Sequence, residues 1–439
     1  MHRISVLSKQ YKIACWLPLF ILLTSCLTRK EDKVVSENIL TDYYRVKVSG
    51  GVVPVYHTRP GALTLVTLDS MPVTVSVDNR AAVEKVEFIP ADAVKKVNMK
   101  DDVVTFEVES EKNFFVKIND NYVYPLMVSI SKVQQAVGNE IRYGKGMHEV
   151  GKLYLKSGQT LMLEEGAYLK GCIVVEGVKD VLIMGSGIIN GTANSSSDQQ
   201  PSILVRQSEN IQIEGISSID PSGVGIQIEE SKGVSIENVK LLGNRELRMS
   251  DDGINIFGST DVQVSNVISN TRNNSIAFMH RSGSPQTETK HVRIRDCIFW
   301  KGDYGNVMEI GYQARGIRLN DVILERIEVA HSLAGAIVGI SAKESKLKGV
   351  HFRKINIHDS RFMNFDIKLD STSELDDLLL EDVHYNGMDA AYSDFQLDVH
   401  QADQVMLKGY HYQDRKVNNP ADAYIRYMDH DIRIIDHRL

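Results

Sequence analysis

Short runs that alternate apolar and polar residues dominate the chain, whereas the apolar spacing of long helices is almost absent. From Tyr43 to about Val133 these runs include "YRVKVSG", "VTVSVD" and "VVTFEVE", and turn residues such as those of "RPGA" separate them. This spacing of short strands is typical of a β-sandwich. We therefore predict an all-β protein whose residues 41–135 form a β-sandwich domain.

From residue 136 onward the alternating runs become periodic. Runs such as "IQIEGISSID", "VSIENVKLLG" and "VQVSNVISN" recur at intervals of about two to three dozen residues, which signals stacked repeats. Each unit also contains a second short strand, as in "GIQIEE" and "GINIFG". Because such a unit has no helix and cannot bury its own apolar face, the coils must stack. The pattern predicts a right-handed parallel β-helix of about ten coils over residues 136–439, with a C-terminal capping segment.

Several residues of the repeats have a structural interpretation. The asparagines Asn238, Asn266 and Asn320 recur near the ends of runs, where asparagine suits the backbone of tight turns. Cys172 and Cys297 each lie in an apolar alternating run, which favours buried free thiols over a disulfide. We expect no metal site and no other cofactor.

The beginning of the chain has the order of a secretory signal. Basic residues precede the apolar run "IACWLPLFILL", and "LTSC" follows it. The apolar run is too short to span a bilayer comfortably. Its ending resembles a bacterial lipoprotein signal, in which cleavage leaves Cys26 as the lipid-bearing first residue, although an ordinary signal peptide is the alternative. Residues 27–40 are polar and indicate a tether. We expect a protein of the bacterial cell envelope, lipid-anchored to the membrane and either periplasmic or surface-exposed.

The overall charge narrows the class of partner. The formal net charge is -7, and no basic stripe is present, which argues against a nucleic-acid partner. The oligomeric state is left open by the sequence.

The candidate site begins at "SDDGINIF", where two aspartates precede a short strand. Alignment of the coils by their second strand gives two columns of residues. The column before the strand contains Val224, Asp252, Asn274 and Asn306. The column on the strand contains Gln227, Asn255, Ala277 and Glu309. Since strand residues alternate between two faces, we expect the second column to face solvent.

Further polar and aromatic residues follow the aspartates in the sequence. The candidates for substrate binding are Asn255, Arg272, Asn273, Asn274, His280, Arg281, Trp300, Tyr304, Asn306 and Tyr312. A surface that combines acids, cations and aromatic platforms is suited to binding sugars, so we expect a carbohydrate partner. His280 is also a candidate acid, although a hydrogen-bonded structural histidine is the alternative.

The acidic candidates are Asp251, Asp252, Asp303 and Glu309. Glycoside hydrolysis normally uses two carboxyl groups, and an inverting mechanism holds them roughly 6.5 to 9.5 Å apart. Carboxylates one or two coils apart on a β-helix reach this separation. The alternative is structural, because Asp-Asp-Gly is also a common turn and exposed acids are often simply solvated.

The segments "MSDDGINIF", "RNNSIAFMH", "IFWKGDYGNVMEIGY" and "IRLNDVILERIEVAHS" resemble glycoside hydrolase family 49, which contains dextranases and isopullulanases. The chain is similar, more distantly, to the polygalacturonases. The resemblance implies a β-sandwich joined to a right-handed β-helix and a glycosidase activity. Both families carry an aspartate before one coil strand and an aspartate pair before the next. The single aspartate matches Asp252, whereas the pair falls on Asn273 and Asn274.

Three functions remain open at this stage. Asparagine cannot act as a general acid or base at neutral pH, so Asp251, Asp303 or Glu309 supplies the second acid in a glycosidase. If none of them does, the protein binds glycans without cleaving them. A lyase or epimerase that acts on uronic acids is the third function, for which Arg272, Arg281 and Lys301 are the basic candidates. We predict a glycosidase that cleaves a poly- or oligosaccharide by an inverting acid/base mechanism.

Overall fold

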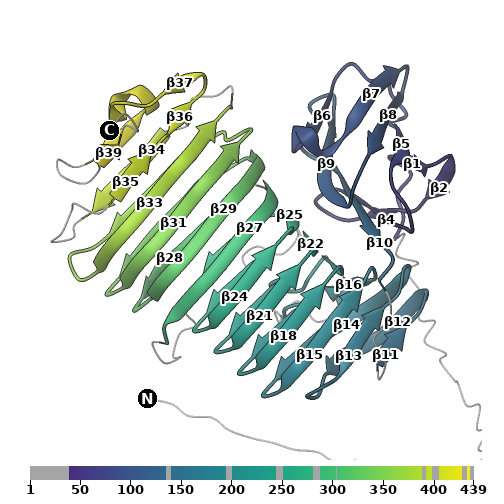
Figure 1. Cartoon of the computed structure of the whole chain (residues 1–439), viewed down its shortest axis with the longest axis horizontal. Helices are drawn as coiled ribbons and strands as arrows, with labels where there is room; N and C mark the ends of the chain where they lie inside the picture. Colours follow the sequence, from purple (N-terminus) through teal and green to yellow (C-terminus); the bar gives the residue numbers. More distant parts are fainter. Residues whose placement is uncertain are drawn as a thin grey trace, which may run out of the picture. The chain divides into compact units, whose positions relative to one another are not determined.

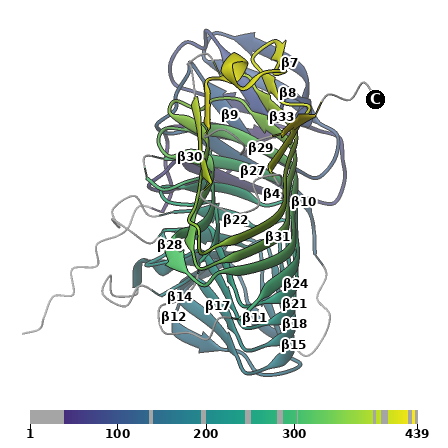
Figure 2. The same ribbon diagram turned by 90° about the vertical axis from the view of Figure 1, so that its left-hand side faces the viewer.

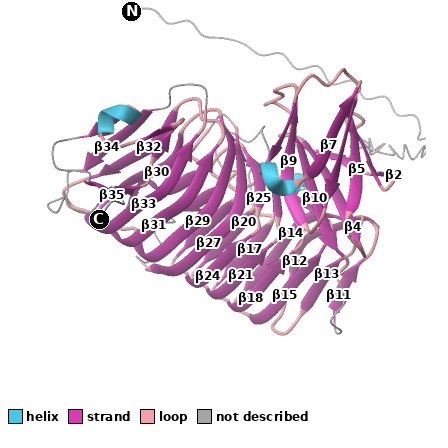
Figure 3. Ribbon diagram, turned by 45° about the horizontal axis from the view of Figure 1, so that its top comes forward, coloured by secondary structure: helices cyan, strands magenta, loops and turns pink. Residues whose placement is uncertain are grey.

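The computed structural model describes residues 39–134, 140–193, 200–243, 251–279, 287–302, 304–387, 392–397, 405–427 and 433–435. These residues belong to one compact unit, Ile39–Leu439. The predicted signal peptide with Cys26, and all but the end of the predicted tether, lie outside the described residues. Among the described residues, no helix has the length and apolar character needed to cross a membrane. Strands make up nearly all of the regular structure, as predicted (Figure 3).

The N-terminal part contains two five-stranded sheets. One sheet has the order β2 (Gly51–Val53), β1 (Arg45–Val48), β5 (Val73–Asp78), β8 (Val103–Val108) and β7 (Lys95–Lys100). The other has the order β3 (Val55–His57), β4 (Ala62–Leu68), β10 (Leu126–Lys132), β9 (Lys112–Ile118) and β6 (Val86–Ile89), with the short 3-10 helix η1 (Ala91–Ala93) after β6. Alternation decides which side chains are buried: in β5 the three valines are buried, and the residues between them are not.

The remainder of the chain is a right-handed parallel β-helix built from three stacks of strands (Figure 1). The first stack contains β11 (Glu140–Tyr143), β13 (Thr160–Leu163), β15 (Lys179–Gly185), β18 (Glu209–Glu214), β21 (Lys232–Glu237), β24 (Thr260–Ser265), β27 (Thr289–Lys301), β29 (Arg318–Ser332), β31 (Lys346–Ile357), β33 (Glu374–Tyr385), β35 (Val405–Lys408) and β39 (Arg433–Ile435). The second stack contains β12 (Gly146–Tyr154), β14 (Ala167–Glu176), β17 (Ile203–Arg206), β20 (Ile226–Glu229), β23 (Ile254–Phe257), β26 (Ile276–Phe278), β28 (Met308–Arg315), β30 (Ala336–Lys343), β32 (Met363–Leu369), β34 (Tyr392–Leu397) and β38 (Ile425–Tyr427). The third stack contains β16 (Ile188–Asn190), β19 (Ser217–Ile219), β22 (Lys240–Leu242), β25 (Ile268–Thr271) and β36 (His411–Tyr412).

The long strands of the later coils belong to two stacks at once. In β27 the first half pairs with β24 and the second half pairs with β25. The short elements that complete the described structure are β37 (Arg415–Lys416) and the 3-10 helices η2 (Gly191–Ala193) and η3 (Pro420–Ala423). In chain order, each coil passes from the first stack to the third stack and then to the second.

The stacks enclose the interior of the β-helix (Figure 2). The side chains that fill this interior are mostly aliphatic. Along the second stack, Ile226, Ile254, Ile276 and Met308 occupy one column, because each pairs with the next in the parallel register. All four side chains are buried. One coil alone leaves these side chains against water, so their burial requires the neighbouring coils.

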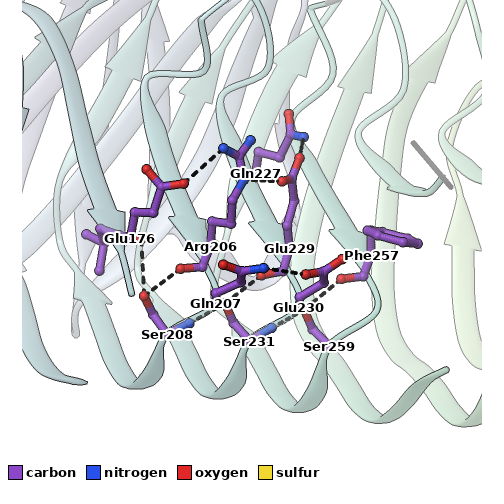
Figure 4. Close-up of polar contacts among 11 residues, drawn as sticks. Glu176, Arg206, Gln207, Ser208, Gln227, Glu229, Glu230, Ser231, Phe257 and Ser259 are labelled. Carbon is purple, nitrogen blue, oxygen red and sulfur yellow. Dashed lines mark hydrogen bonds and ion pairs between the residues drawn. The ribbon is translucent and has the colours of Figure 1, made fainter. Parts of the chain in front are cut away.

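Serines and asparagines fix the corners. At the corner between the second and first stacks, the Ser231 hydroxyl accepts a hydrogen bond from the backbone of Ser208 at 3.2 Å, and the Ser259 hydroxyl accepts one from Ser231 at 3.1 Å (Figure 4). The stacked serines thus bond each corner to the next. Asn238 and Asn266 adopt left-handed backbone conformations, with φ of 52° and 54°, which agrees with their predicted corner role.

The N-terminal sheets and the β-helix share a small apolar cluster. Leu63, Phe115 and Met127 of the sheets pack with residues of the third stack, including Ile268 and Trp300. Polar contacts accompany it: Asn270 donates to the Pro60 carbonyl at 2.9 Å.

Candidate active site at one corner of the β-helix

The candidate site lies at the corner where each coil passes from the third stack to the second. The pairs Asn255↔Ala277 and Ala277↔Glu309 reproduce the column deduced from the sequence. Asp252 and Asn274 lie two residues before their strands, as does Asn306 before β28. The two predicted columns are therefore present in the register of the fold.

A continuous path of hydrogen bonds crosses three coils of this corner. The Asp252 carboxylate accepts hydrogen bonds from the backbone N–H of Asn274 at 3.0 Å and from its side-chain amide at 2.9 Å. The Asn274 side-chain oxygen accepts one from the backbone N–H of Asn306 at 2.7 Å. The Asn306 side-chain amide donates to the Glu309 carboxylate, and its oxygen accepts from the Ala336 backbone at 2.6 Å. Two amides thus connect two carboxyl groups.

Asp251 and Asp252 accept hydrogen bonds from different residues. Oδ2 of Asp251 accepts a hydrogen bond from the Arg272 backbone N–H at 3.1 Å. Oδ1 of Asp251 is buried and has no hydrogen-bond partner among the described residues. A buried carboxyl oxygen without a partner is costly when the group is ionised, so the surroundings of Asp251 favour its protonated form.

The pKa values of the two aspartates are raised to different extents. The pKa of Asp251 is raised to about 8, chiefly by burial; the hydrogen bond from the Arg272 backbone opposes the rise, and the nearby charge of Asp252 adds to it. Burial also raises the pKa of Asp252, but hydrogen bonds from Asn255 and Asn274 stabilise its ionised form, so its pKa is about 6. At neutral pH the two adjacent carboxyl groups therefore favour opposite protonation states.

The expectation of a solvent-facing surface is wrong for these groups. The exposed fractions are 1% for Asp251 and 2% for both Asp252 and Glu309, and Asn255, Asn273 and Asn274 are also buried. The strand column does point away from the apolar core, as alternation requires. Its members Asn255, Ala277 and Glu309 are nevertheless buried, so a position that faces away from the core is not necessarily in contact with water.

Trp300 is not the exposed platform that we expected. Its side chain has an exposed fraction of 0% and packs on Phe115 of β9, with ring centres 5.1 Å apart. The N-terminal sheets therefore cover it. Tyr304 is exposed, and Arg272 is half-buried beside the aspartates.

The remaining candidates cannot be placed. Asp303, His280 and Arg281, together with the side chain of Tyr312, lie outside the described residues. Among the described residues, no group of three or more histidine, cysteine, aspartate or glutamate side chains could hold a metal ion.

Two glycines of the site were missed in the sequence. A Cβ on Gly305 would meet the side-chain oxygens of Asn273 and Asn274, and a Cβ on Gly339 would meet Asn306 and lie 3.0 Å from Glu309. Both glycines therefore leave room for the polar path. Gly339 pairs with Glu309, so extending the column by one coil would have found it.

Comparisons with known proteins support the architecture. The family model described as "Right handed beta helix region" matches residues 164–314. No curated protein matches the chain. The fold is similar to that of Dex49A from Penicillium minioluteum, with a TM-score of 0.65 and 11% identity over 90% of this chain and 94% of that chain. It is also similar to a polygalacturonase from Erwinia carotovora ssp. carotovora, with a TM-score of 0.52 and 14% identity over 68% of this chain and 90% of that chain. At these identities the comparisons establish a shared right-handed β-helix fold.

Proposed function

We propose that this protein is a glycoside hydrolase that cleaves a poly- or oligosaccharide, and that Cys26 anchors it in the bacterial cell envelope. The observation that carries the enzymatic proposal is the buried path from Asp252 to Glu309 through Asn274 and Asn306. The resemblance of the sequence to dextranases and the fold shared with a polygalacturonase support the same class.

Asp251 is the proposed proton donor. Its pKa of about 8 keeps the carboxyl group protonated at neutral pH, as a general acid requires. The acid transfers its proton to the glycosidic oxygen as the bond between that oxygen and the anomeric carbon breaks. Asp252 is held ionised by its hydrogen-bond donors, and its negative charge stabilises the oxocarbenium-like transition state.

Glu309 is the proposed general base. Strands β23 and β28 are separated by β26, so their backbones lie about 9.6 Å apart, twice the spacing of adjacent strands. This backbone spacing is comparable with the separation of roughly 6.5 to 9.5 Å that inverting enzymes keep between their two carboxyl groups to admit a water molecule. Glu309 takes a proton from the water molecule as the oxygen atom of that water attacks the anomeric carbon. Because the three carboxyl groups are buried, a sugar reaches them only when the groups around them move aside.

Incubation of the protein with a panel of soluble polysaccharides tests the proposal. We expect new reducing ends from at least one of them, without the ultraviolet-absorbing unsaturated ends that a lyase creates. Binding of a glycan without new reducing ends would overturn the hydrolase.

That outcome would favour a glycan-binding protein without catalytic activity. The substitution of the family's aspartate pair by Asn273 and Asn274 and the burial of the carboxyl groups are the observations in its favour.

A further inference from the structure

A cavity of about 520 Å³ lies between residues 120–123 of the N-terminal sheets and the corner that carries the candidate site. The β-helix contributes Arg272, Trp300, Lys301, His331, Leu333 and Arg361 to its lining. Four successive turns between the third and second stacks carry Arg272, Gly302, Leu333 and Arg361. Trp300 and Lys301 lie at the end of the strand before the second of these turns, and His331 lies near the end of the strand before the third. The volume is within the range of small-ligand sites.

The cavity begins one coil beyond the two aspartates. Arg272 connects the two regions, because its backbone N–H donates to Asp251 at 3.1 Å while its side chain lines the cavity. The next coil is bonded to it: the backbone N–H of Gly302 donates to the Thr271 carbonyl at 2.8 Å, and that of Tyr304 donates to the Arg272 carbonyl at 3.1 Å. The corner that carries Asp251 therefore continues directly into the wall of the cavity.

The charge changes sign along this corner. Among the described residues of the lining, three have cationic side chains, Arg272, Lys301 and Arg361, and one has a carboxylate, Asp120. Asp120 is itself 2.9 Å from the ammonium group of Lys85. The lining therefore carries a positive balance, which attracts an anionic group.

Lys301 and Arg361 are held in different ways. The Lys301 side chain is fully buried, and its ammonium group donates to the backbone carbonyls of Gly302, at 3.3 Å, and Ala334. The exposed Arg361 guanidinium lies 4.8 Å from the centre of the Tyr122 ring and 3.7 Å from the Asp359 carboxylate. Lys301 is thus fixed within the wall of the cavity, whereas Arg361 lies at an accessible edge of it.

Uncharged groups of the cavity suit a sugar ring. Tyr122 is half-buried and provides aromatic surface. Trp300 is fully buried in the wall of the cavity, and its indole N–H has no hydrogen-bond partner in the part of the chain that the structure describes. His331 is 2.7 Å from Asp359, and burial lowers the pKa of this histidine, which favours a neutral ring. Apolar walls with a few polar groups are typical of small-ligand sites.

We propose that this cavity binds a sugar residue bearing a carboxylate or a sulfate, and that the substrate is an acidic polysaccharide. This inference rests on the proposed hydrolase function and specifies its substrate class. The neighbouring residue of the same sugar chain lies at Asp251 and Asp252, where the glycosidic bond is cleaved.

Calorimetric titration of the full-length chain in detergent tests the inference. The probes are tetrasaccharides of hyaluronan, alginate, polygalacturonate and chondroitin sulfate, each beside its carboxyl-reduced or desulfated counterpart. We expect at least one acidic probe to bind at least about tenfold more tightly than its counterpart, because charge-assisted hydrogen bonds are the strong ones. Arg361→Gln should reduce that preference about tenfold, and added salt should weaken it.

The matched control is Arg326→Gln, which removes an exposed arginine paired with Asp296 at 2.7 Å outside the cavity. It should leave the preference unchanged, and thermal melting should show that both variants are folded. The carboxyl-reduced and desulfated pairs distinguish a uronic acid from a sulfated sugar. Equal binding of acidic and neutral probes, absence of binding to every acidic probe, or a preference that survives Arg361→Gln would overturn the inference. Arg361-dependent binding without new reducing ends would support it while contradicting the hydrolase.

Discussion

The side-chain amide of Asn274 donates a hydrogen bond to the carboxylate of Asp252 across one coil, at 2.9 Å. An aspartate at position 274 would instead place a second carboxyl group against the first, and two carboxyls at such a distance cannot both ionise readily. The amide therefore helps to keep Asp252 ionised, and it passes the connection on to Asn306. The amide at position 274 thus has a structural role at this site, whichever function the protein performs.

Asp252→Asn should reduce turnover by at least about a hundredfold, the low end for loss of a positioned acid or base, because the amide retains the shape but not the negative charge. The fold should survive, since the new side-chain oxygen can still accept from Asn274. Release of reducing ends measures the first effect and thermal melting the second. The control is Asp261→Asn, which changes an exposed carboxylate that contacts His291 at 3.1 Å. A folded and fully active Asp252→Asn enzyme would contradict the assignment.

Glu309→Gln tests the other end of the path. Glutamine can still accept from Asn306 but cannot take a proton from water, so we expect turnover to fall at least about a hundredfold with little change in glycan affinity. Initial rates and calorimetric binding separate the two quantities. Glu344→Gln is the matched control, because Glu344 is an exposed acid paired with Arg315 at 2.8 Å. Unchanged turnover would remove Glu309 from the mechanism.

The sequence predicts the fold well because alternation has a single structural consequence. A strand whose apolar residues occupy every second position must bury one face, so the columns through Ile254, Ile276 and Met308 follow from the pattern alone. The same triplets fix the register, and the register places Asp252 two coils before Asn306. Glycine positions such as Gly339 follow from the same register.

Burial of the site could not be predicted in this way. Alternation states which face of a strand a residue occupies, but not what covers that face. Trp300 illustrates the difference, because the residue that covers it, Phe115, belongs to β9 of the N-terminal sheets and no local pattern connects the two. The pKa values of Asp251 and Asp252 follow from burial and could not be anticipated either.

Asp251 should make the stability of the protein depend on pH. Its folded pKa of about 8 lies above its ordinary value of 3.8, so the folded state binds the proton more tightly. The stabilisation is fully present below about pH 4 and is lost as the pH rises towards about 8. A single proton changes the free energy of unfolding by up to about 4 kcal/mol between about pH 4.5 and about pH 7.5.

Asp251→Asn removes this dependence, so the variant should gain stability relative to the wild type as the pH rises. Urea unfolding at the two pH values measures the difference. If that difference does not change with pH, Asp251 does not hold a proton in the folded protein.

Cys26 should carry lipid, as the "LTSC" order indicates. Growth of cells with a clickable fatty acid should label the wild type and should leave Cys26→Ala unlabelled, because the variant lacks the thiol to which the lipid attaches. Equal labelling of the two proteins would rule out the anchor at this residue. Fractionation of the same cells should find the wild type with the membranes and the variant released from them.

Gly305→Ala should disturb the site, because the added Cβ would contact the asparagine side chains beside Asp252. Gly305 has a φ of +66°, and a Cβ there would lie 2.7 Å from the Asn274 side-chain oxygen and would also meet Asn273. Overpacking of this kind costs about 1–3 kcal/mol, and it displaces the amide that holds Asp252. We therefore expect a lower melting temperature together with a loss of turnover of about tenfold or more.

Gly177→Ala separates these contacts from backbone strain. Gly177 has nearly the same φ, +65°, but a Cβ there would meet nothing within 4 Å. The left-handed conformation itself costs roughly 1–2 kcal/mol for a residue with a Cβ, and both variants share that cost. Gly305→Ala should consequently melt below Gly177→Ala, and only Gly305→Ala should lose turnover. Equal melting temperatures and equal activities of the two variants would show that Asn273 and Asn274 can shift freely. The amides would then not hold Asp252 rigidly, as the proposed mechanism requires.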